Sequence, residues 1–186
     1  MSRHGWFRVA GQSGDRTPEE QLKGLQPALA VCNGKRVLDL GCAEGAISRE
    51  FAMSGAHVFG LDMLEDHLAV ARQICQGMTV KFVRSELAEW IRNHPEPEQF
   101  DIVLALSVAH KLHHPGMLIT FAARSAREMV VFRGPGKVGM MWDGWLKAKH
   151  RGNKCHVPTI FAEHGFTEGE TLPSGHGERV QYWHKS

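Results

Sequence analysis

The sequence lacks the cysteine pairs that mark zinc sites and disulfide frameworks. Its four cysteines, Cys32, Cys42, Cys75 and Cys155, include no C-x-x-C pair, so reduced thiols are the simplest interpretation. No apolar run approaches the roughly 18 residues that a membrane-spanning helix needs. The first residues also lack the apolar core of a signal peptide. We therefore expect a cytoplasmic protein that does not span a membrane.

Composition sets few limits on function. The 186 residues are 42% hydrophobic and 23% charged, which fits one globular domain, and the net charge of +2 says little about partners. The charge is unevenly distributed: residues 121–156 carry eight basic and two acidic residues, whereas residues 17–101 carry eight basic and thirteen acidic residues. The local basic excess suggests an anionic partner or substrate, and a solvated surface is the equally acceptable alternative.

Short apolar segments alternate with helical segments along most of the chain. This order predicts βαβ units and a parallel sheet covered on both faces. The predicted strands are 36–40, 57–62, 79–84, 100–106 and 128–132, and the predicted helices are 17–33, 46–54, 65–76, 86–93 and 115–125.

The pattern changes after Arg133. We expect a helix over 140–150 that carries two tryptophans and several lysines, and a short helix over 158–164. Two final strands, 167–171 and 179–184, are predicted to form an antiparallel hairpin. The fold class is therefore α/β, with a doubly wound, mostly parallel seven-stranded sheet. Residues 1–16 form an N-terminal arm, residues 17–186 form the domain, and 134–156 is a basic, tryptophan-containing insertion.

A strand, loop and helix over 36–54 form the first candidate ligand site. Gly41 and Gly45 remove side chains where the backbone must turn tightly and approach a ligand. Asp39 precedes this turn, and Asp62 ends the next strand, where an acidic residue can accept hydrogen bonds from ribose hydroxyls. Both features lie at the carboxyl ends of adjacent strands, where open α/β sheets bind ligands.

The phosphate-binding patterns of nucleotide-binding proteins are missing from this loop. It contains no G-x-G-x-x-G fingerprint and no Walker A lysine, and Glu44 would repel a pyrophosphate. These absences argue against a nicotinamide-dependent enzyme and favour a nucleoside ligand without phosphates.

Residues 37–45 (VLDLGCAEG) resemble motif I of class I S-adenosylmethionine (SAM)-dependent methyltransferases. Ala43 departs from the usual central glycine and restricts the backbone slightly. Residues 100–107 resemble motif IV, the fourth strand of that family, and residues 161–166 resemble its E-x-G-F segment. The resemblance implies the class I methyltransferase fold, with SAM as the cofactor and S-adenosylhomocysteine (SAH) as the product.

The resemblance also implies roles for single residues. Asp62 matches the ribose-binding acid, Met63 the residue on the adenine, and Ser85 and Glu86 the contacts to the adenine amino group. Other roles for these residues are a helix cap for Asp62, a core position for Met63 and a helix-terminal acid at Glu86. The predicted cofactor-binding residues are Asp39, Gly41, Cys42, Ala43, Gly45, Asp62, Met63, Ser85, Glu86 and Leu106.

The segment after the strand 100–106 is expected to lie beside the methyl group of SAM. His110 is the candidate general base, because imidazole titrates near neutrality, and a structural histidine is the alternative. His110, His113 and His114 together suggest a metal site, but no carboxylate or cysteine lies among them and methyl transfer needs no metal, so none is predicted. The segment is not the Asp/Asn-Pro-Pro-Tyr/Phe motif of enzymes that methylate the exocyclic amines of bases.

The sequence predicts only the chemical class of the methyl acceptor. Tryptophans and lysines in the 134–156 insertion suit an anionic or aromatic acceptor, or RNA, and an amphipathic helix with buried tryptophans is the alternative. A small anionic molecule is favoured over RNA because the chain has little material for a further substrate domain. A non-catalytic SAM-binding module is the rival hypothesis.

Overall fold

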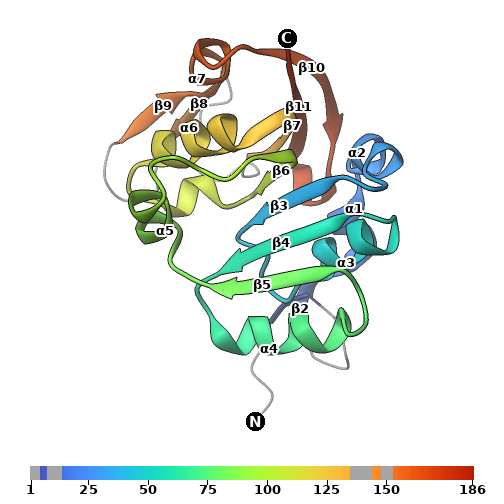
Figure 1. Ribbon diagram of the computed structural model, residues 1–186. Coiled ribbons are helices and arrows are strands. Elements are labelled where there is room, and N and C mark those ends of the chain that lie inside the picture. The colour runs from blue at the N-terminus through green and yellow to red at the C-terminus, as the bar shows by residue number, and fades with distance from the viewer. Residues whose placement is uncertain (1–4, 8–13, 135–143, 148–152) are drawn as a thin grey trace.

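The chain folds around a seven-stranded sheet with five adjacent parallel strands (Figure 1). The computed structural model describes residues 5–7, 14–134, 144–147 and 153–186. The last two strands form an antiparallel hairpin, which joins the parallel strands at one edge. In spatial order the strands are β10 (Phe166–Pro173), β11 (Arg179–Lys185), β7 (Ala126–Arg133), β6 (Phe100–Leu106), β3 (Arg36–Leu40), β4 (His57–Asp62) and β5 (Val80–Arg84).

Helices cover both faces of this sheet, as Figure 1 shows. Neighbouring residues of β3 enter different cores: Val37 packs with Phe51 of α3, and Leu38 packs in the cluster that contains Phe161 of α7. Burial on both faces explains why the strands are almost wholly apolar. The helices are α1 (Pro18–Leu22), α2 (Gln26–Val31), α3 (Ala46–Met53), α4 (Glu65–Ile74), α5 (Leu87–Asn93), α6 (Pro115–Ser125) and α7 (Val157–Glu163), with 3-10 turns η1 (Ala109–Lys111) and η2 (Gly175–Gly177).

The predicted fold class, including the antiparallel C-terminal hairpin, is confirmed. The single helix expected over 17–33 is wrong, because the chain forms α1 and α2 there. Thr17 and Glu20 make the capping box at the start of α1. The break lies at Gly24, whose φ is +84° and where an added Cβ would lie 2.9 Å from the carbonyl oxygen of Pro173. A close approach of the C-terminal hairpin, invisible in the local pattern, therefore ends the first helix.

The insertion contains a β-hairpin rather than the helix expected over 140–150. Strand β8 (Trp145–Lys147) pairs antiparallel with β9 (Lys154–His156). Leu146 is buried while its two neighbours are exposed, as expected for a strand, whose successive side chains point to opposite faces. Residues 140–143, with Trp142, and 148–150 lie outside the described residues.

The N-terminal segment contributes a small sheet of its own. Strand β1 (Gly5–Phe7) pairs parallel with β2 (Gly14–Arg16). The division into an arm at 1–16 and a domain at 17–186 stays a prediction. Within the described ranges, no helix is long and apolar enough to cross a membrane.

Candidate functional site

The loop between β3 and α3 turns through three residues with positive φ. These are Gly41 at +81°, Ala43 at +48° and Gly45 at +74°. Ala43 adopts this left-handed conformation at a cost of roughly 1–2 kcal/mol, which glycine would avoid. The N–H groups of Gly41 and Cys42 both donate to the carbonyl of Leu61, at 2.8 and 2.9 Å. The loop is therefore held against the end of β4.

Gly45 faces α4 with no room for a side chain, because an added Cβ would lie 2.7 Å from the Cβ of Ala71. We expect Gly45→Ala to lower the free energy of unfolding by about 3 kcal/mol through crowding and backbone strain. Urea unfolding measures this change. Gly77→Ala is the matched control, since Gly77 has a φ of +79° but nothing within 4 Å of an added Cβ. Gly77→Ala should lower the free energy of unfolding by only about 1 kcal/mol. Equal losses for Gly45→Ala and Gly77→Ala would contradict the packing argument.

The carboxylate of Asp62 closes the loop from the end of β4. Its Oδ2 accepts the N–H of Ala43 at 3.0 Å, and its Oδ1 accepts the N–H of Leu64 at 2.9 Å. Burial tends to raise the pKa of Asp62, but hydrogen bonds from His67 and these two N–H groups hold it below its ordinary value. A carboxylate offers about four acceptor positions. An ionised Asp62 can therefore hold Leu64, the residue before α4, and still accept ribose hydroxyls.

His67 links Asp62 to a second carboxylate, that of Glu44. Its Nε2 lies 3.4 Å from Oε1 of Glu44, and its Nδ1 lies 3.5 Å from Oδ1 of Asp62. The Asp62 carboxylate raises the pKa of His67, although burial opposes this shift. When His67 is protonated, it places a positive charge beside Glu44, which is fully buried in the loop between β3 and α3.

Asp39 lies behind the loop and connects β3 to α3. Its Oδ2 accepts the hydroxyl of Ser48 at 2.7 Å, and its side chain is buried. Burial raises the pKa of Asp39 to about 6, although the Ser48 hydroxyl opposes the shift. In this position Asp39 supports the loop between β3 and α3.

Asp39 should make the protein less stable as the pH rises from about 4 to about 6. Because its native pKa of about 6 exceeds the unfolded value of 3.8, only the native state holds the proton in this window. One pKa unit corresponds to 1.36 kcal/mol, so the complete titration costs about 3 kcal/mol, of which about 2 kcal/mol falls between pH 4 and pH 6.5. Asp39→Asn keeps an acceptor for Ser48 and should remove this loss in urea unfolding at pH 4 and pH 6.5. An unchanged difference between the two pH values would refute the assignment.

Three further predicted residues follow β4 and β5. Met63 is 56% exposed, so it is not a core residue. The N–H of Ser85 donates to the carbonyl of Asp62 at 3.0 Å. Glu86 caps α5 by accepting two N–H groups of its first turn, which is the helix-terminal role. An exposed apolar side chain next to an ionised carboxylate provides a surface for a base and acceptors for a ribose, so the residues present fit a nucleoside.

The acceptor loop begins where the chain leaves β6 at Leu106. Ser107 has a φ of +54°, and η1 follows with the half-buried His110. Val108 packs on the cofactor loop, since a Cβ added to Gly41 would lie 2.9 Å from its Cγ2. The structure thus brings the predicted cofactor loop and the predicted acceptor loop into contact.

Asn153 of the insertion is hydrogen-bonded to the acceptor loop. Its Nδ2 donates to the carbonyl of His113 at 2.8 Å and lies 3.3 Å from Nδ1 of His114. In the part of the chain that the structure describes, no three His, Cys, Asp or Glu side chains are grouped as metal ligands. The contact gives the β8–β9 hairpin a direct connection to the predicted site of chemistry.

A buried ion pair lies behind Ser107. Nε of Arg133 is 3.3 Å from Oε2 of Glu178, and the two side chains are only 3% and 5% exposed. Burial lowers the pKa of Arg133 to about 10, although Glu178 opposes this shift, so Arg133 stays protonated at neutral pH. Other N–H groups of Arg133 donate to Gln21 and to the hydroxyl of Ser174.

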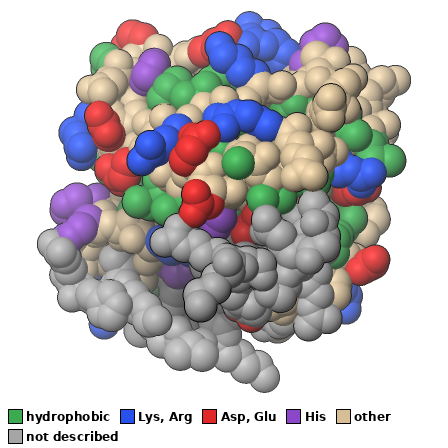
Figure 2. All heavy atoms as spheres, turned by 90° about the horizontal axis from the view of Figure 1, so that it is seen from below, with side chains coloured by type: hydrophobic (Ala, Val, Ile, Leu, Met, Phe, Trp, Pro, Cys, Tyr) green, Lys and Arg blue, Asp and Glu red, His purple; other side chains and the backbone are tan. Residues whose placement is uncertain are grey.

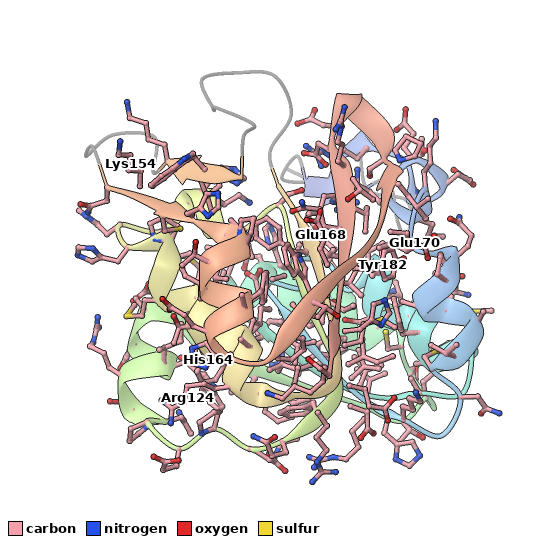
Figure 3. The ribbon with its side chains drawn as sticks, turned by 90° about the horizontal axis from the view of Figure 1, so that it is seen from above. Arg124, Lys154, His164, Glu168, Glu170 and Tyr182 are labelled. Atoms are coloured by element: carbon pink, nitrogen blue, oxygen red, sulfur yellow. The ribbon has the colours of Figure 1, made fainter. Side chains whose placement is uncertain are left out.

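The basic residues of segment 121–156 do not form one patch in the described part of the chain. Arg124 and Arg127 pair with carboxylates near the start of β6 and β7, and Arg133 is buried. Figure 3 places Lys154 and Arg124 near opposite ends of α6. Figure 2 shows basic and acidic side chains interspersed on the face seen from below. The excess in the sequence is therefore not a continuous anion-binding surface in these ranges.

The sequence profile of the methyltransferase domain matches residues 32–156, which contain both loops. The chain belongs to this methyltransferase domain family. Its membership confirms the family that the motif at residues 37–45 predicted.

Known proteins resemble this methyltransferase domain in part. The ubiquinone biosynthesis O-methyltransferase of Hahella chejuensis is 38% identical over 100 residues, which cover 53% of this chain and 41% of that protein. The chain thus spans about two fifths of the length of the curated relatives it matches.

Two solved structures show the same fold. Magnesium protoporphyrin IX methyltransferase from Synechocystis PCC 6803 with bound SAM has a TM-score of 0.69 and 20% identity, covering 91% of this chain and 80% of that one. A putative RNA methyltransferase from Pyrococcus horikoshii has a TM-score of 0.60 and 17% identity, covering 87% and 78%. The likeness confirms the predicted class I fold.

Several residues of this methyltransferase domain that shape the site were not predicted from the sequence. His67 follows Asp62 by five residues in the first turn of α4, and a search for titratable neighbours of Asp62 would have found it. Arg133 and Glu178 are 45 positions apart and carry no local signal.

Proposed function

We propose that this domain is an enzyme that transfers a methyl group from SAM to a small anionic acceptor and releases SAH. The observation that carries the proposal is the ionised Asp62, bonded to the loop of motif I at the end of β4. The related ubiquinone biosynthesis enzymes are named O-methyltransferases, which supports oxygen as the methylated atom.

The residues of the chain bind and orient the reactants in this proposal. SAM supplies a methyl group on a sulfonium that carries its own leaving group. Asp62 accepts hydrogen bonds from the ribose hydroxyls, and Met63 contacts the adenine. Gly41 and Gly45 let the loop backbone approach the cofactor, so the protein acts mainly by placing two reactants in line.

His110 is the proposed general base. A hydroxyl acceptor must lose its proton when its oxygen is methylated, and imidazole accepts a proton near neutral pH. Its Nδ1 is buried, whereas the side chain as a whole is only half-buried. Nε2 is therefore the nitrogen that we assign to the proton transfer.

The β8–β9 hairpin is the proposed binding element for the acceptor. Nζ of Lys154 lies 5.0 Å from the centre of the Trp145 ring, which is 38% exposed. Asn153 connects this hairpin to the acceptor loop. An aromatic face beside an ammonium group suits an anionic aromatic acceptor. The same pair suits a stacked base, so RNA is the alternative acceptor.

Transfer of label from methyl-labelled SAM tests the proposal. The acceptors to compare are small hydroxylated aromatic acids, with 3,4-dihydroxybenzoate as the first probe, and total RNA. We expect label in the small acids, and a fall of about a hundredfold in kcat for His110→Ala. His113→Ala, on the same loop, is the matched control.

Each other outcome rejects a stated part of the proposal. Label in RNA alone would reject the small acceptor. Binding of SAM without transfer to either class would favour the non-catalytic module. Equal losses for His110→Ala and His113→Ala would reject His110 as the base.

A further inference from the structure

Ser107 has a left-handed backbone at the junction between the two halves of the site. It is one of two described non-glycine residues with positive φ, and the other, Ala43, is in the cofactor loop. Its N–H donates to the carbonyl of Arg133 at 2.8 Å. A serine is disfavoured in this conformation, so the surrounding structure must hold it there.

The side chain of Ser107 is held by both members of the buried ion pair. Its hydroxyl donates to Oε2 of Glu178 at 3.1 Å and accepts Nε of Arg133 at 3.0 Å. Both charged side chains are more than nine-tenths buried. In such surroundings charged hydrogen bonds are strong and fix the geometry of the group between them.

The ion pair is itself held by Gln21 and Arg16. Arg133 donates to the carbonyl and to the amide oxygen of Gln21, at 2.9 and 2.7 Å. Nη2 of Arg16 lies 3.5 Å from the other carboxylate oxygen of Glu178. The chain segments around β2 and α1, the end of β7 and the start of β11 therefore all meet at the ion pair that holds Ser107.

The turn at Ser107 determines where Val108 lies. Val108 is 8% exposed, and its Cγ2 would lie 2.9 Å from a Cβ at Gly41, so it packs directly on the backbone of the cofactor loop. If Ser107 relaxed to a negative φ, the chain after it would change direction. Val108 would then lose its contact with Gly41.

We infer that Glu178 and Arg133 are positioning residues for cofactor binding, and that they act by holding Ser107 left-handed so that Val108 supports the loop at Gly41. In this inference both side chains act through Ser107. This inference rests on the proposed function, because SAH is the ligand that reports on the loop.

The affinity for SAH tests the inference in Glu178→Ala. We expect calorimetry to show a Kd for SAH about tenfold higher than in the unsubstituted protein, which corresponds to a loss of about 1.4 kcal/mol of binding free energy. Adding Ser107→Gly to this variant should restore the Kd to within about threefold, because glycine adopts a positive φ without support. Adding Ser107→Ala should not restore it.

A variant destabilised elsewhere is the control. Phe161→Leu removes a fully buried ring in the core around α7 and should lower Tm while leaving the Kd for SAH unchanged. The inference is overturned if Glu178→Ala binds SAH as tightly as the unsubstituted protein, or if glycine and alanine at position 107 act alike. Absence of SAH binding by the unsubstituted protein would instead refute the proposed function.

Discussion

Replacing Asp62 by alanine should weaken SAH binding by at least about a hundredfold. The carboxylate would no longer accept the ribose hydroxyls, and the N–H groups of Ala43 and Leu64 would lose their acceptor. Hydrogen bonds to a charged group contribute about 1.5–3 kcal/mol each, so losing two of them gives a factor of about a hundred or more. Isothermal titration calorimetry with SAH measures the change.

The control for this variant is Glu65→Ala. Glu65 starts α4 three residues later, and its ion pair with Arg72 is exposed to solvent. Exposed pairs contribute little, so the Kd for SAH should stay within about twofold. If Asp62→Ala bound SAH as well as Glu65→Ala does, Asp62 would not be the ribose-binding residue.

Replacing Arg133 by methionine should lower the free energy of unfolding by about 3–5 kcal/mol. The change leaves the Glu178 carboxylate buried, with the hydroxyl of Ser107 at 3.1 Å and Nη2 of Arg16 at 3.5 Å. Breaking a buried pair from one side has this cost because one charge stays uncompensated. Urea unfolding at pH 7 is the measurement, since Arg133 is protonated there.

A double substitution and a surface control complete this experiment. Adding Glu178→Met to Arg133→Met removes the uncompensated charge and should recover at least half of the loss. Arg72→Met breaks an exposed pair and should cost less than about 1 kcal/mol. A loss no larger for Arg133→Met than for Arg72→Met would contradict a structural role for the buried pair.

The sheet and the cofactor loop were predictable because their signals are local. Each strand and helix has its own apolar period, and Gly41, Gly45 and Asp62 occupy positions that the backbone and ribose chemistry require. The capping box at Thr17 is also a local signal, because Thr17 and Glu20 are only three residues apart.

The errors arose where distant segments decide the structure. The break at Gly24 depends on the carbonyl of Pro173, and the strand at β8 depends on pairing with β9. The Arg133–Glu178 pair joins the end of β7 to the start of β11. In each case the local pattern permits two structures, and a contact far along the sequence selects one.

The crystal structure of the protein with SAH tests the central claim most directly. We predict that the ribose hydroxyls donate to the Asp62 carboxylate, that the adenine lies on Met63, and that the sulfur faces the loop from Ser107 to His110. A ligand bound away from the ends of β3 and β4, or a ribose that leaves Asp62 bonded only to Ala43 and Leu64, would contradict the account.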